Sequence, residues 1–174
     1  APTGRTPMDP AHKKIALRMI PYGLYVLTAE AEDGTVAAAT VNWVTQTSFE
    51  PPLVALGVKG DSAAHAIIKQ VGTFALNILG KGQHSTAFAF FKSVEREGDS
   101  IGGEPFRRGI SGAPLLESVP AWLECRLRGT LEEGDHSLFL AEVIDAGVAR
   151  TPAGRPDDET LTLRDLGEKT FYGG

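Results

Sequence analysis

Hydroxyl and amide side chains recur with a period of two between residues 40 and 48, a spacing that could bind a polar ligand. The β-branched residues of this segment favour a pleated backbone, in which alternate side chains share one face. The polar face carries Thr40, Asn42, Gln46 and Ser48. The segment therefore predicts a strand with one face that hydrogen-bonds and one that packs.

A possible anion site follows this strand. Pro51 and Pro52 remove two backbone donors and must end the strand, and a short apolar strand over residues 53–58 comes next. Ser62 then precedes a predicted helix over residues 63–70, where its oxygen would act as an N-cap. A helix N-terminus with Lys59 beside it suits a phosphate group. The same residues are equally consistent with an ordinary helix cap and a strand that faces water.

The elements around these segments indicate a β-rich fold. The 20 glycines and 11 prolines indicate many turns. The patterns predict helices over 11–19, 63–70 and 83–92, and strands over 23–29, 36–47, 53–58, 73–79, 121–131 and 137–149. The first two strands would form a hairpin with an Asp33-Gly34 turn. The stretches 93–112, with five glycines, and 150–159 are expected to be loops. Six or so antiparallel strands suit a small Greek-key barrel.

Several motifs resemble the flavin reductase-like family, the FMN-binding split barrels. They read T-V-N-W-V-T-Q-T-S (40–48), E-P-P-L (50–53), K-G-D-S (59–62), F-A-L-N-I-L (74–79), G-D-H-S-L-F-L-A-E-V (134–143) and F-Y-G-G (171–174). The chain departs from the family pattern at Trp43, Gln46 and Ala63. These departures leave open whether the flavin exchanges and whether it is FMN or FAD.

The resemblance implies one split-barrel domain over residues 1–174, with residues 1–20 as a tail and short helix, and a homodimer with the flavin where subunits meet. It implies flavin contacts from Thr40, Asn42, Trp43, Val44, Gln46, Ser48, Lys59, Ser62, His65, Phe91 and Lys92. His136, Tyr172 and Gly173 would bind the nicotinamide, with His136 as the catalytic residue. From the residues alone, Trp43 could stack on the flavin or pack in an interface, His65 could reach the phosphate or solvent, and His136 could simply bond its own loop.

The implied activity is hydride transfer from NADH or NADPH to FMN, possibly FAD, in which the cofactor carries the chemistry. The reduced flavin could serve a partner monooxygenase. The alternatives are a flavoprotein that keeps FMN for electron transfer, and a split barrel that binds haem or a deazaflavin. Arg107-Arg108 is the only candidate for the 2′-phosphate of NADPH, which favours NADH.

Composition excludes other classes of function. The 174 residues are 42% hydrophobic and 22% charged, which is enough for one buried core. A net charge of −5 without basic runs argues against nucleic acid. No metal-binding or Rossmann motif is found. The single Cys125 cannot form an internal disulfide, and residues 1–10 do not resemble a signal peptide. A cytoplasmic protein with no membrane contact is expected.

Overall fold

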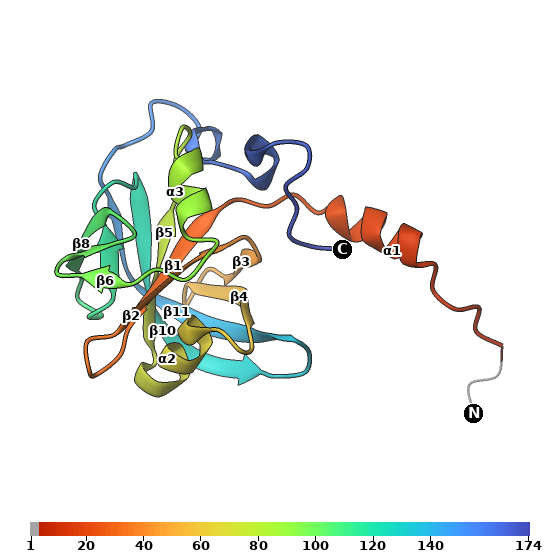
Figure 1. Cartoon of the computed structure of the whole chain (residues 1–174), viewed down its shortest axis with the longest axis horizontal. Coiled ribbons are helices and arrows are strands. Elements are labelled where there is room, and N and C mark those ends of the chain that lie inside the picture. The colour runs from red at the N-terminus through yellow and green to blue at the C-terminus, as the bar shows by residue number, and fades with distance from the viewer. Residues whose placement is uncertain (1–3) are drawn as a thin grey trace.

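The computed structural model describes residues 4–174, and its centre is one curled antiparallel sheet (Figure 1). Seven strands lie in the order β2-β1-β5-β10-β11-β4-β3. Their bounds are β1 Tyr25–Glu30, β2 Val36–Val41, β3 Val44–Ser48, β4 Leu53–Lys59, β5 Thr73–Ile78, β10 Ala121–Leu131 and β11 His136–Val148. The predicted mainly β fold with helices is therefore confirmed.

The chain itself forces this sheet to curl. Strands β2 and β3 lie at opposite edges of the sheet, yet only Asn42 and Trp43 separate them along the chain. The sheet must therefore bend until its two edges almost meet, which gives a barrel that is split between β2 and β3. The prediction of one strand over residues 36–47 was wrong, because the chain leaves one edge of the sheet at Val41 and joins the other at Val44.

Two helices and a small second sheet pack around the barrel, and a further helix projects from it (Figure 1). Helices α1, α2 and α3 span Pro10–Arg18, Ala63–Val71 and His84–Ala89. The predicted helix over 83–92 ends early because the chain turns at Phe90, whose carbonyl accepts from the N–H of Thr40 at 3.0 Å. The predicted loop over 93–112 instead contains β6 Arg96–Glu97, β7 Ser100–Ile101 and β8 Glu104–Arg108, which form the second sheet with β9 Pro114–Leu116. Two 3₁₀ turns, Pro156–Glu159 and Leu163–Leu166, follow β11.

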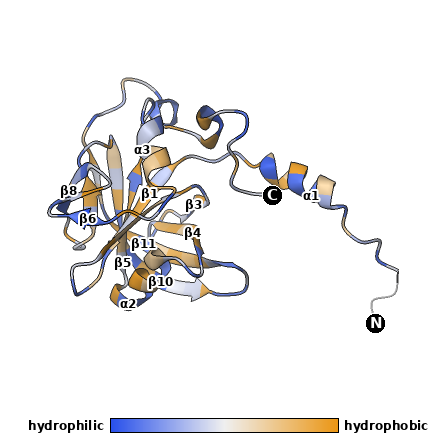
Figure 2. Cartoon of the chain, viewed as in Figure 1, coloured by the Kyte–Doolittle hydropathy of each residue, from blue (hydrophilic) through white to orange (hydrophobic). Residues whose placement is uncertain are grey.

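The hydrophobic core has two main parts. One lies under α2, where Ile68 packs with Phe74 and Phe139 of the barrel. The other lies between the barrel, α3 and the small sheet, around Phe90 and Phe106. Figure 2 shows the hydrophobic residues concentrated on the strands of the central sheet.

Helix α1 differs from the other two because it projects from the body and has no buried residue (Figure 1). Its Arg18 Nε donates to the carbonyl of Gly173 at 3.2 Å, so the C-terminal segment lies against it. None of the helices within residues 4–174 is long and apolar enough to cross a membrane. The predicted tail and short helix over residues 1–20 are described only from residue 4, so the first three residues lie outside the structure described.

Candidate functional site

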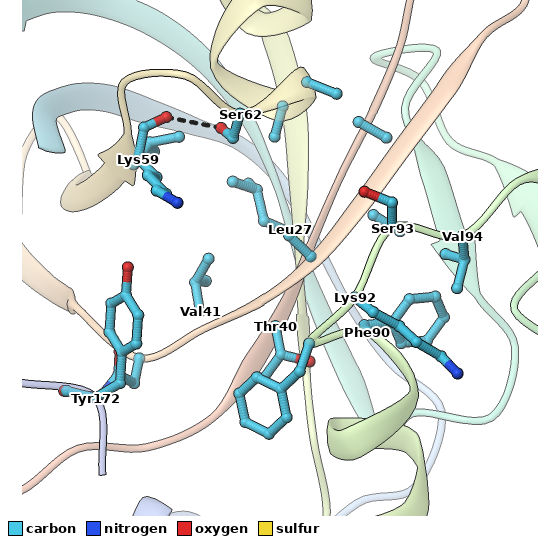
Figure 3. Close-up of a pocket in the computed structure, with 18 of the residues that line it drawn as sticks. Leu27, Thr40, Val41, Lys59, Ser62, Phe90, Lys92, Ser93, Val94 and Tyr172 are labelled. Carbon is cyan, nitrogen blue, oxygen red and sulfur yellow. Dashed lines mark hydrogen bonds between the residues drawn. The ribbon is translucent and has the colours of Figure 1, made fainter. Parts of the chain in front are cut away.

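A cavity of about 540 Å³ opens beside the split in the barrel (Figure 3). Strand β2 forms one wall with residues 36–41, and the opposite wall is the end of β4 with the start of α2. The rest of the lining comes from residues 90–94 and from Leu24, Leu27, Asn42, His136, Leu163 and Tyr172. A cavity of this size lies within the range of about 300–1,000 Å³ that is usual for small-molecule and cofactor sites.

One end of the cavity is suited to an anion. Ser62 Oγ caps α2 by accepting from the N–H of His65 at 3.1 Å, as the sequence predicted. The first N–H groups of a helix have no acceptor within it. Ala63 and Ala64 line this cavity, and no hydrogen bond from either backbone N–H is found within residues 4–174. Lys59 lies beside them, 3.6 Å from the exposed carboxylate of Asp61. Two free N–H groups, a helix dipole and a lysine form a donor set that fits a phosphate.

The long wall offers backbone groups rather than side chains. Thr40 donates its hydroxyl to the carbonyl of Ala87 at 2.7 Å and its N–H to Phe90. The backbone N–H of Thr40 thus points away from β1, and alternate residues of a strand point the same way. Ala38, which also lines the cavity, therefore directs its N–H and C=O toward the open edge. With Leu27, Val41 and Val94 around it, this edge suits a flat ring with a polar rim.

A hydrogen-bonded row of three side chains lies close to this anion site, because His136 on β11 is the cross-strand partner of Lys59 on β4. His136 Nδ1 lies 2.9 Å from Asp135 Oδ1, and His136 Nε2 bonds the hydroxyl of Tyr172. The hydrogen bond from His136 lowers the pKa of Asp135. Burial, together with the nearby carboxylates of Asp135 and Asp61, raises the pKa of Tyr172. Tyr172 therefore stays a protonated donor, and the row is satisfied when neutral His136 donates from Nδ1 to Asp135.

Trp43 supports this row from outside the cavity lining. Its ring lies 4.7 Å from that of His136 and 5.2 Å from that of Tyr172, between ring centroids. Such tilted aromatic contacts add about 0.5–1.5 kcal/mol beyond area burial. The indole packs on Gly57, where a Cβ atom would come within 2.9 Å of Trp43 Cε3. Its Nε1 is buried and has no hydrogen-bond partner among the described residues.

The structure brings together eight of the predicted site residues and leaves six outside the cavity. Those lining it are Thr40, Asn42, Lys59, Ser62, Phe91, Lys92, His136 and Tyr172. Those outside are Trp43, Val44, Gln46, Ser48, His65 and Gly173. The break at residues 42–43 carries Val44, Gln46 and Ser48 to the far edge of the sheet. His65 turns inward to Ser137, at 2.8 Å, rather than toward phosphate or solvent.

Two of the lining residues differ from their predicted place or use. Asn42 donates its side-chain amide to the carbonyl of Tyr172 at 3.0 Å, so it fixes the C-terminal segment. Lys92 lies at the opposite end of the cavity from Lys59 and Ser62 (Figure 3), so the two lysines do not share one anion.

Sequence reasoning missed residues that line the cavity with their backbone or with small side chains. They include Ala37, Ala38, Ala63, Ala64, Ser93 and Val94. The signal that could have found some of them is the edge position of residues 36–41, which leaves backbone groups unpaired.

The comparisons with known proteins agree with this geometry. Residues 17–164 match the family model described as "Flavin reductase like domain". The chain is 33% identical to an NADH-dependent flavin reductase of Pseudomonas fluorescens over 81% of its own length and 80% of the relative's.

Two solved structures are also similar. One is the NADH:FAD oxidoreductase of Streptomyces globisporus C-1027, with 30% identity, a TM-score of 0.69, and coverage of 83% of this chain and 88% of that one. The other is the styrene monooxygenase flavin reductase of Pseudomonas putida S12, with 32% identity, a TM-score of 0.67, and coverage of 81% and 88%. With its split barrel, its cavity and a family match over most of its length, the chain belongs to the flavin reductase-like domain family.

Proposed function

We propose that the protein is an NAD(P)H-dependent flavin oxidoreductase and that flavin and nicotinamide meet in the cavity beside β2. The observation that carries the proposal is that one cavity combines an anion site at α2, an unpaired strand edge, and the row of Asp135, His136 and Tyr172. When bound, a flavin supplies the hydride acceptor, while the protein supplies binding and orientation.

Each part has a proposed role. The N–H groups of Ala63 and Ala64 bind the flavin phosphate with Lys59, and the backbone of Ala38 orients the ring edge. His136 and Tyr172 contact the nicotinamide, with His136 held in one orientation by Asp135 on one side and by Trp43 underneath.

FMN is the proposed flavin. FAD is a second candidate, because the related Streptomyces protein is named an NADH:FAD oxidoreductase. NADH is the proposed donor. Arg108 pairs with Glu30 at 2.7 Å, and Arg107 lies over the ring of Trp122. Both arginines line a separate cavity, so neither supports a 2′-phosphate site here.

Two partners are proposed. A homodimer would cover α1, since a helix of nine residues with no buried side chain is not stable alone. Its Ile15, Leu17 and Met19 are exposed. A monooxygenase that receives reduced flavin is proposed because one similar protein is the flavin reductase of a styrene monooxygenase. We also propose a cytoplasmic location, where the reduced nicotinamide pool is available.

An absorbance spectrum of the purified protein with FMN, followed by anaerobic NADH and then NADPH, tests the proposal. Flavin peaks that bleach on addition of NADH would support it and identify the donor. A retained flavin that neither nucleotide bleaches would favour an electron-transfer role. Failure to bind FMN, or a Soret band with haem, would point to a different ligand.

The roles of the anion site and of the row can be tested separately. His136→Ala is expected to raise the KM for NADH more than the Kd for FMN, because this change leaves the proposed phosphate donors, Lys59 and the first N–H groups of α2, in place. Unchanged NADH turnover in this variant would remove His136 from the nicotinamide site.

A further inference from the structure

His65 and Ser137 form a buried pair next to, but outside, the cavity. His65 is 7% exposed and Ser137 is 3% exposed. His65 Nε2 lies 2.8 Å from Ser137 Oγ, and its ring lies 4.9 Å from that of Phe139, between centroids. Glu132 Oε1 is 3.6 Å from the same nitrogen, but its carboxylate is also bound at 3.0 Å by Lys69 at the surface. No ligand can reach this pair without opening the core.

Each member of the pair is directly linked to a residue of the cavity lining, His65 to Ser62 and Ser137 to His136. The backbone N–H of His65 donates to Ser62 Oγ, which caps the helix whose first N–H groups form the anion site. Ser137 directly follows His136 on β11. Around the pair, the N–H of Gly60 donates to the carbonyl of Asp135 at 2.9 Å. The turn before α2 and the turn before β11 are therefore joined twice, by the backbone bond from Gly60 to Asp135 and, just after the turns, by the buried bond between His65 and Ser137.

We propose that His65 is a positioning residue, which through Ser137 holds the anion-binding start of α2 at a fixed place against β11. The proposal rests on the proposed function, since it assumes that this end binds the flavin phosphate. The helix N–H groups have fixed directions, so their contribution to binding depends on where the first turn of α2 sits. A rotation of that turn would misdirect the N–H groups of Ala63 and Ala64 without altering the strand edge that faces the ring.

The test compares Kd values for FMN and for riboflavin, which has the same ring but no phosphate. Fluorescence titration would be done on the full chain, wild type and Ser137→Ala, with His65→Ala and the conservative His65→Gln as further variants. Ser137→Ala is the mildest change because it removes one hydroxyl. Loss of one net hydrogen bond of about 1 kcal/mol corresponds to roughly fivefold in Kd. We expect this increase for FMN, less than twofold change for riboflavin, and partial recovery in His65→Gln.

Thr28→Val is the matched control. It also removes a buried hydroxyl, which donates to the carbonyl of Pro114 at 2.6 Å and accepts from Asn77 Nδ2 at 3.0 Å, and neither bond involves α2 or β11. It should leave the ratio of the two Kd values unchanged.

Equal weakening of both flavins in Ser137→Ala, or a changed ratio in Thr28→Val as well, would overturn the positioning role and leave only a general effect on stability. An unchanged FMN Kd in both His65→Ala and Ser137→Ala would also overturn it. If the wild-type protein bound neither flavin, the proposed function itself would fall first, and the positioning role with it.

Discussion

The contact between Gly57 and Trp43 predicts that Gly57→Ala destabilises the wild-type protein but stabilises a variant in which Trp43 is replaced by alanine. Gly57 lies within β4, and its backbone is not in the left-handed region, so alanine is sterically allowed by the backbone itself. A Cβ atom there would lie 2.9 Å from Trp43 Cε3 and 3.4 Å from Trp43 Cβ. The indole has little room to yield, because His136 and Tyr172 lie on it.

Gly57→Ala should therefore destabilise the wild-type protein by about 1–3 kcal/mol, the usual cost of overpacking. In a Trp43→Ala background the obstruction is gone, and the same change should stabilise by about 0.5–1 kcal/mol, the usual gain when alanine replaces glycine in a strand. Urea unfolding of the four proteins, with the slopes of the transitions compared, measures both values. The double-mutant cycle gives the coupling energy directly.

The same variant is also expected to change the binding of NADH. If the shifted indole displaces His136, Gly57→Ala should raise the KM for NADH while riboflavin affinity changes little. Equal changes in unfolding free energy in the two backgrounds would refute the reasoning, because they would mean that Trp43 is not what confines position 57.

Three further predictions concern residues away from the cavity. The hydrogen bond from Arg108 lowers the pKa of Glu30 below its ordinary value of 4.5. Glu30 therefore stabilises the fold at pH values above 4.5, and this contribution is lost as the pH falls through the lowered pKa. Glu30→Gln should flatten this part of a plot of unfolding free energy against pH. Burial raises the pKa of Cys125 to about 12, so a thiol reagent at pH 8 should modify it only after denaturant is added. Gly109→Ala should destabilise by more than about 2 kcal/mol in thermal unfolding, because its Cβ would lie 2.0 Å from the buried carboxylate of Glu124.

Local patterns were enough to predict most of the barrel. The strands over 53–58, 73–79 and 121–131 and the helix after Ser62 lie within a residue or two of their observed bounds. Period-two alternation, prolines at strand ends and a serine before an apolar run are signals carried by neighbouring residues, so a single sequence contains them.

The break at Asn42 and Trp43 could not be predicted in the same way. Both residues continue the alternation of the strand before them, and nothing local shows that the chain changes from one sheet edge to the other. The change depends on pairing of β3 with β4 and of β2 with β1, which are contacts between separate segments. The small sheet was missed for a related reason, since β6 and β7 have only two residues each and β9 only three, too few to show a period.

The polar residues of the site illustrate the same limit at the level of single hydrogen bonds. The polar side chains of Thr40 and Asn42 led to the prediction that both contact the ligand, and both do line the cavity. Their donors, however, are used by the protein: Thr40 fixes the end of α3 through Ala87, and Asn42 fixes the segment that carries Tyr172. These two bonds hold two other segments, the end of α3 and the C-terminal segment, beside the end of β2. A ligand in this cavity must therefore meet the unpaired backbone of β2 and the start of α2, which no side-chain motif encodes, and whose donors survive most substitutions of the side chains beside them.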